Sequence, residues 1–134
     1  MKGREKMNYL DMYKIILEII AQKNPKDFQE ILDESKHYQI VKDYLASESP
    51  NQFLIQNMEN TLLSLINSGL VSGIISPLKY VTLIKVNGLT ISGFQYLKKL
   101  QEKDAINEIK AILKSNNQAI TPETLTKALS QLVF

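Results

Sequence analysis

The chain has 134 residues, a formal net charge of +2 and no cysteine. A chain of this length can bury a sizeable core without disulfides or metals, and the lack of cysteine excludes disulfides, thiolate metal sites and cysteine catalysis. The weak positive charge permits binding to nucleic acid but is far below that of a protein built to coat it. We therefore expect one globular domain in a reducing, cytoplasmic setting.

The N-terminal segment is charged and leads into the first helical pattern. Asp11, Lys14 and Glu18 interrupt the apolar run that an export signal or a membrane span would need. We expect residues 1–7 to form a flexible tail, with no export signal and no membrane segment.

Helical periodicity then dominates the first third of the chain. The pattern over residues 8–22 predicts an amphipathic helix that stops at Asn24-Pro25, because proline disfavours helix in the residue before it. Residues 27–45 predict one or two further helices, with a break around residues 35–37.

The most regular predicted helix covers residues 52–68, and Gly69 follows it where a left-handed cap is favoured. The apolar positions that we expect to face the core are Ile55, Met58, Leu62, Leu65 and Ile66. The opposite stripe is polar yet almost uncharged, and it consists of Gln52, Gln56, Asn60, Ser64 and Asn67. This composition is unusual for a solvated helix face.

A β-hairpin is predicted next, because residues 70–75 and 80–86 are rich in β-branched and apolar side chains. We expect Asn87-Gly88 to end the hairpin and Thr90 to cap a new helix. The apolar residues of that helix are Phe94, Leu97 and Leu100.

Two further helices are predicted at the C-terminal end, over residues 104–114 and after Thr121-Pro122, where proline occupies the first helical position. Leu125, Leu129 and Leu132 share one side of the last helix. We divide the chain into a domain of residues 8–103 and C-terminal helices over 104–134. These helices either pack on that domain, which we prefer, or form a dimer seam.

The order of three helices, hairpin and helix is the winged-helix plan, so the sequence predicts a mainly α fold with a small β-hairpin, a winged helix-turn-helix with additional C-terminal helices. Gly69 allows the third helix to turn directly into the first strand. Thr90 offers an oxygen to the free amides of the following helix, and Gly93 allows that helix to approach a neighbour closely.

Residues 68–74, 89–98 and 108–114 resemble the YjcQ-like family of small bacterial and phage proteins, and residues 13–19 give a weaker likeness. The resemblance implies a winged-helix fold in a family without an established activity, and it carries over no catalytic or metal-binding residue. The segment 27–49 and the last helix lie outside the family pattern.

Binding of duplex DNA is the sharper functional hypothesis. In a winged helix the third helix enters the major groove and the hairpin contacts the backbone, and asparagine and glutamine pair with adenine edges. The candidate DNA- or partner-binding residues are Gln52, Gln56, Asn57, Asn60, Ser64 and Asn67, with Lys79 and Lys85 as phosphate contacts. The protein would then be a transcription regulator of phage or prophage type that acts as a homodimer.

One objection leaves a second hypothesis equally open. Phosphate contacts come chiefly from lysine and arginine, but the third helix contains neither and carries Glu59. An uncharged face suits a protein surface better than a polyanion. The alternative is a non-catalytic protein–protein interaction module that uses the winged-helix fold.

Catalysis is not predicted. His37 is the sole histidine and has no partner visible in the sequence, so we interpret it as a surface residue. Asp33 and Glu34 are adjacent on a helix and point in different directions, which makes them a poor ligand pair. We expect no catalytic residues, no metal and no cofactor.

Overall fold

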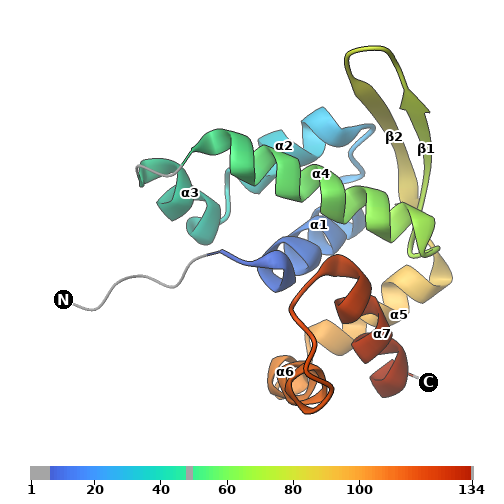
Figure 1. The fold of residues 1–134 in the computed structure, drawn as a ribbon. Helices are drawn as coiled ribbons and strands as arrows, with labels where there is room; N and C mark the ends of the chain where they lie inside the picture. The colour runs from blue at the N-terminus through green and yellow to red at the C-terminus, as the bar shows by residue number, and fades with distance from the viewer. Residues whose placement is uncertain (1–6, 48–49, 134) are drawn as a thin grey trace.

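The computed structural model describes residues 7–47 and 50–133, so residues 1–6 of the predicted tail lie outside it. The described residues form seven helices and one two-stranded antiparallel hairpin, which confirms a mainly helical class with a small β-hairpin (Figure 1). The elements are α1 (Tyr9–Lys23), α2 (Phe28–Ser35), α3 (Gln39–Ala46), α4 (Asn51–Asn67), β1 (Val71–Pro77), β2 (Thr82–Leu89), α5 (Ile91–Leu100), α6 (Ala105–Ser115) and α7 (Pro122–Val133).

Helix α1 is the central helix of the body (Figure 1). It begins as predicted after Asn8, whose side chain accepts the backbone N–H of Asp11 while the Asp11 carboxylate accepts the N–H of Asn8. It ends at Asn24, in the left-handed conformation, just before Pro25. Eight of its fifteen side chains are buried, which is more than one amphipathic stripe provides. Other elements therefore surround the helix, namely α2, α4, β2, α5 and α7.

The predicted break divides residues 27–45 into two helices. Asp27 caps α2 by accepting the N–H of Glu30, and the chain turns through Lys36 and His37 before α3. Val41 is the one fully buried side chain of α3. Helix α3 therefore lies at the periphery of the body (Figure 1).

The end of α4 confirms the role expected of Gly69. Gly69 has a φ of 81°, its N–H donates to the carbonyl of Ile66, and the N–H of Leu70 donates to the carbonyl of Leu65. These two bonds form a Schellman motif, which satisfies carbonyls that the helix end would otherwise leave free. The chain consequently turns from helix into strand within three residues.

The hairpin is confirmed, but the prediction that Asn87-Gly88 ends it is wrong. Strand β2 continues to Leu89, because Asn87 is the extra residue of a bulge: Ser72 pairs with Gly88 while Gly73 pairs with Val86. Gly88 has a φ of 145°, which a side chain would disfavour.

The link between α1 and α2 holds the base of the hairpin. The N–H of Val86 donates to the carbonyl of Lys26 at 2.8 Å, and Asp27 forms an isolated antiparallel bridge with Lys85. The edge of β2 is therefore partly covered, whereas no strand of the described residues lies along the outer edge of β1.

Helix α5 begins as predicted at Thr90, whose hydroxyl accepts the N–H of Gly93 at 3.0 Å and reaches the carbonyls of Gly69 and Leu70. A Cβ on Gly93 would collide with the carbonyl oxygen of Leu70. The close approach expected at Gly93 is thus present.

Helix α7 packs on its own domain. Leu125, Ala128 and Leu129 are buried in the common core, and the hydroxyl of Thr126 lies 2.8 Å from that of Tyr13 on α1. Helix α7 therefore contacts α1, α4, α5 and α6 of its own chain. The dimer-seam alternative for the C-terminal helices stays a prediction.

Candidate functional site

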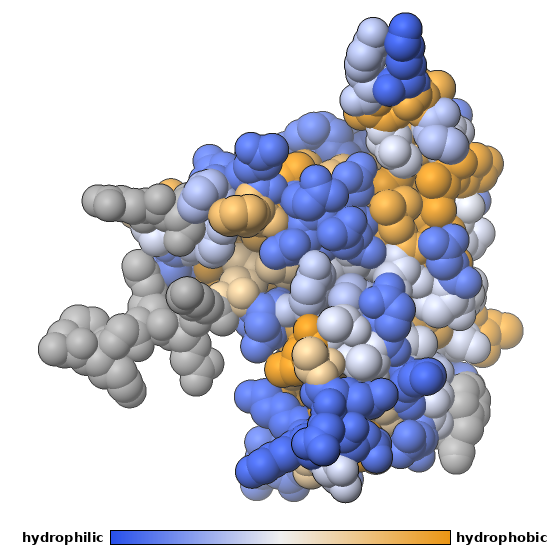
Figure 2. Space-filling model, in the orientation of Figure 1, coloured by the Kyte–Doolittle hydropathy of each residue, from blue (hydrophilic) through white to orange (hydrophobic). Residues whose placement is uncertain are grey.

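Helix α4 presents the amide side chains that the sequence singled out. Gln52, Gln56, Asn60 and Asn67 are exposed, as predicted. Hydrophilic side chains cover the middle of this helix on the face shown in Figure 2. The uncovered amides form a face able to donate and accept hydrogen bonds, and we call Gln52, Gln56, Asn60 and Asn67 the amide face.

Two of the predicted binding residues do not belong to that face. Asn57 is half-buried and accepts a hydrogen bond from the hydroxyl of Tyr9 at 3.1 Å. Ser64 is buried, with 9% of its surface exposed, so its expected outward position is wrong. Each four-residue step along the stripe overshoots a full turn by about 40°, so Ser64 has rotated by about 120° from Gln52. It therefore reaches the covered flank, whereas Asn67 follows by a three-residue step and returns outward.

Apolar residues are also exposed on α4. Phe53 is 63% exposed and Ile55 is 45% exposed, although the sequence pattern placed Ile55 with the core. The first turns of the helix extend past the centre of the body, where Leu54 alone faces inward. Ile55 lines a cavity between α2, α3 and α4.

The surroundings of the amide face are neutral to acidic. Glu59 is half-buried on α4, and Glu123 lines the hollow beside Asn60 at the start of α7. Lys79 is at the hairpin tip, with its Nζ 5.3 Å from the centre of the Tyr80 ring. Lysine and arginine are absent from α4 itself. The face therefore lacks the cations on which phosphate binding depends.

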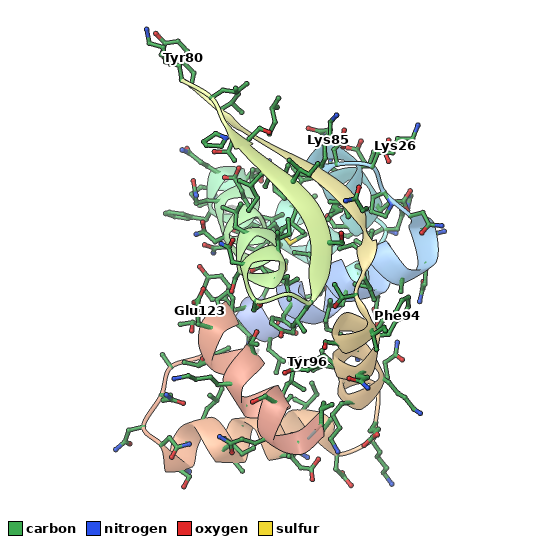
Figure 3. All side chains as sticks on the ribbon, turned by 90° about the vertical axis from the view of Figure 1, so that its right-hand side faces the viewer. Lys26, Tyr80, Lys85, Phe94, Tyr96 and Glu123 are labelled. Atoms are coloured by element: carbon green, nitrogen blue, oxygen red, sulfur yellow. The ribbon has the colours of Figure 1, made fainter. Side chains whose placement is uncertain are left out.

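Lys85 lies on a different side of the hairpin. Gly73 is turned toward Ile66 of α4, and the paired residues Ile74 and Lys85 point the other way, because successive strand residues alternate between faces. Figure 3 shows α4 on one side of the hairpin and Lys85, beside Lys26, on the other. Lys85 is thus not brought together with the amide face.

The side of the hairpin that carries Lys85 is largely apolar. The pairs Ile74–Lys85 and Ser76–Leu83 share it. Leu78 and Val81 lie on this side as well, because the alternation between faces continues to the turn. The Leu78 N–H donates a hydrogen bond to the Val81 carbonyl across that turn. Ile74, Leu78, Val81 and Leu83 are all exposed, and we call these four residues with Lys85 the outer hairpin face.

Helix α5 adds two more exposed apolar side chains. The pattern of the helix suggested that Phe94 faces the core with Leu97 and Leu100, but Phe94 is exposed, as is Ile91. Gly93 occupies the contact with Leu70 instead, so the next side chain is directed outward. In Figure 3 Phe94 lies beside α5 on the right, the same side of the picture as Lys26 and Lys85.

Exposed apolar residues are consequently concentrated in one part of the molecule. Of the nine large apolar side chains that are exposed among the described residues, seven lie on the hairpin or at the start of α5, and they are Ile74, Leu78, Tyr80, Val81, Leu83, Ile91 and Phe94. This concentration was not predicted from the sequence, although the alternation of apolar residues around the turn already indicated it.

Positive charges border this apolar region. Lys26, Lys79, Lys85 and Lys98 form no ion pair with any described residue, whereas Lys99 is bound to Glu102 and Glu108 at 2.9 and 3.5 Å. The region therefore combines apolar side chains with free cations at its margin.

Two tyrosines with raised pKa values hold parts of the body together. Burial raises the pKa of Tyr13. Burial and the neighbouring Glu18 carboxylate raise the pKa of Tyr38 to about 12. Both hydroxyls hold helices together, Tyr13 through Thr126 and Tyr38 by donating to Glu18 at 3.1 Å. His37 is exposed, and no group of three or more His, Asp or Glu side chains in residues 7–47 and 50–133 is placed to hold a metal ion.

Comparison with known proteins gives no match to a family model, to a curated protein or to a solved structure. No helix within the described ranges has the length and apolar character needed to cross a membrane.

Proposed function

We propose that this chain is a non-catalytic winged-helix protein that binds another protein through the outer hairpin face and the start of α5. The element order supports the winged-helix plan that the resemblance to the YjcQ-like family implies. The elements occur in the order that this plan requires: α1, the Lys26–Asp27 segment that bridges to β2, α2, α4, the hairpin and α5. Helix α3 is then an insertion, and α6 and α7 are additions.

The observation that carries the proposal is the concentration of exposed apolar residues on one side of the molecule. Complete burial of a leucine, isoleucine or phenylalanine side chain stabilises a contact by about 1.5–3 kcal/mol. Contiguous exposed apolar surface on a small protein commonly marks a protein contact. Four unpaired lysines at its margin favour a partner whose apolar surface is bordered by carboxylates.

Photo-crosslinking from single positions tests this assignment. A photoreactive phenylalanine analogue replaces Leu83 or Phe94 in one set of variants and Gln56 or Asn60 in a control set. All four native side chains are exposed, so the substitutions leave the core intact. We expect one protein partner to be crosslinked from positions 83 and 94 and not from 56 and 60. The reverse pattern would refute the proposal.

A second candidate function is binding of duplex DNA by α4, favoured by the exposure of Gln56 and Asn60, which can pair with base edges. Lys79 at the hairpin tip is then the candidate phosphate contact on the hairpin. Titration of a fluorescent random duplex at low salt tests it. Binding that weakens steeply with added salt supports DNA as the ligand. The affinity of Lys79→Ala for the duplex should then depend less steeply on salt than that of the parent chain. Absence of binding at micromolar protein excludes it.

A further inference from the structure

The outer edge of β1 is open for strand pairing. The sheet has the order β1–β2, and the Lys26–Asp27 segment lies against β2, so no strand of the described residues occupies the far side of β1. A strand at the edge of a sheet presents unpaired backbone N–H and C=O groups that can pair with another chain.

The hydrogen bonds of the hairpin reveal which groups point to this edge. Val86 donates its N–H to Lys26, so its backbone polar groups point away from β1. Its partner Gly73 therefore belongs to a pair that is not hydrogen-bonded within the hairpin. Such pairs alternate along the ladder, so Gly73 and Ile75 direct their N–H and C=O groups outward from β1.

Strand β1 also lacks the usual protection against edge pairing. Its sequence from Val71 to Pro77 contains no charged residue, and Pro77 interrupts its amide donors only at the end. Ile74, at the centre, is exposed. Natural edge strands generally carry lysine, a bulge or an inward charge that prevents association.

We propose that β1 pairs antiparallel with β1 of a second copy of this chain, about a two-fold axis at Ile74. In this register Gly73 of each copy lies opposite Ile75 of the other. The outward N–H and C=O groups of the two residues then hydrogen-bond to each other, which gives two equivalent pairs. The two Ile74 side chains lie directly opposite each other, at the closer spacing of a pair that is not hydrogen-bonded. A four-stranded sheet results.

A second copy fits this edge better than another occupant for two reasons. A two-fold interface brings each residue near its own equivalent, so charge on the strand would repel itself, and β1 has none. Leu125 and Leu129 are not available for a dimer contact, because α7 buries both of them in its own domain. Seven residues of strand make a small contact, and we therefore expect a dimer that dissociates on dilution.

Charge substitution at the axis tests the proposal. Ile74→Glu places two carboxylates opposite each other in the dimer, and Ile74→Lys places two ammonium groups there. Each variant alone should weaken dimerisation at least about tenfold in sedimentation velocity across a concentration series. An equimolar mixture of the two should restore a dimer, because glutamate then faces lysine. This rescue excludes misfolding as the cause.

Leu83→Glu is the matched control, since Leu83 and Ile74 share a face and are 52% and 56% exposed, but Leu83 lies on β2. It should change the dimer affinity less than about twofold while abolishing the partner crosslink from position 94, so the two proposals can fail separately. In hydrogen exchange, the amides of Gly73 and Ile75 should become protected as concentration rises. A chain that stays monomeric at near-millimolar concentration, or a failed rescue by the mixture, would overturn the proposal.

Discussion

Helix α7 and the hairpin differ in what their apolar residues contact. The leucines of α7 pack against α1, α4, α5 and α6, and Leu125 and Leu129 have no exposed surface. The hairpin projects from the body (Figure 1), and only its inner face, with Ile84 and Val86, is buried. The helices use their apolar side chains to stabilise the fold, whereas half of those on the hairpin remain available for another molecule.

Truncation of a core residue in the helical body should have the largest effect. Ile16 of α1 is fully buried, and Ile16→Ala should lower the free energy of unfolding by about 2–5 kcal/mol. Ile74→Ala on the hairpin should cost less than about 1 kcal/mol, because Ile74 is already solvated. Urea denaturation followed by circular dichroism measures both. Equal losses would show that the outer hairpin face is part of the core.

Alanine substitutions of Gly69 and Gly93, at the two ends of the hairpin, should distinguish two causes of destabilisation, a steric clash and a strained backbone conformation. Gly93→Ala forces a methyl group against the Leu70 carbonyl and should destabilise by about 1–3 kcal/mol or more. Gly69→Ala meets no neighbouring atom but has a positive φ, which costs about 1–2 kcal/mol. Thermal unfolding of the two variants compares them. A more severe effect at Gly69 would contradict the packing described for α5.

Alkaline pH should weaken the helical body through its tyrosines. The pKa of Tyr38 is raised from 10.0 to about 12 in the folded chain, so the unfolded chain releases this proton first as pH rises. The stabilising contribution of the neutral hydroxyl is complete below pH 10.0 and is lost as pH rises toward about 12. Denaturation midpoints across this range should fall less steeply in Tyr38→Phe. An unchanged slope would assign the loss to other groups, with Tyr13 the first to examine.

A polar substitution on the outer hairpin face should have the smallest effect on stability. Leu83→Ser should change the free energy of unfolding by less than about 0.5 kcal/mol, because Leu83 is exposed. The same variant should bind less of an apolar fluorescent dye than the parent chain. Lys110→Ser, at an exposed position on α6, serves as the control that should leave dye binding unchanged.

Element boundaries were largely predictable because local chemistry determines them. Asn24-Pro25, Gly69 and Thr90 each end or begin an element through their own backbone or hydroxyl group. The bulge at Asn87 was missed, since an Asn-Gly pair is equally compatible with a turn and with an extra residue inside a ladder.

Exposure was harder to predict than secondary structure. Ser64 and Phe94 show the two kinds of error. Ser64 is polar and was expected at the surface, but it is buried; Phe94 is aromatic and was expected in the core, but it is exposed. Helical spacing identifies which residues share a face, but which face is covered depends on the elements packed there, and these come from distant parts of the chain. The outer hairpin face and the open edge of β1 became visible only with the register.

The hydrogen bond between Val86 and Lys26 has a mechanical consequence. Lys26 belongs to the short link between the central helix α1 and α2, so the base of the hairpin is fastened to the end of α1. A pull or twist applied at the tip by a bound molecule reaches α1 through this backbone contact and through the buried side chains of β2, Ile84 and Val86. A displacement of the hairpin is therefore expected to shift the end of α1, and with it the helices α2, α4, α5 and α7 that pack on α1.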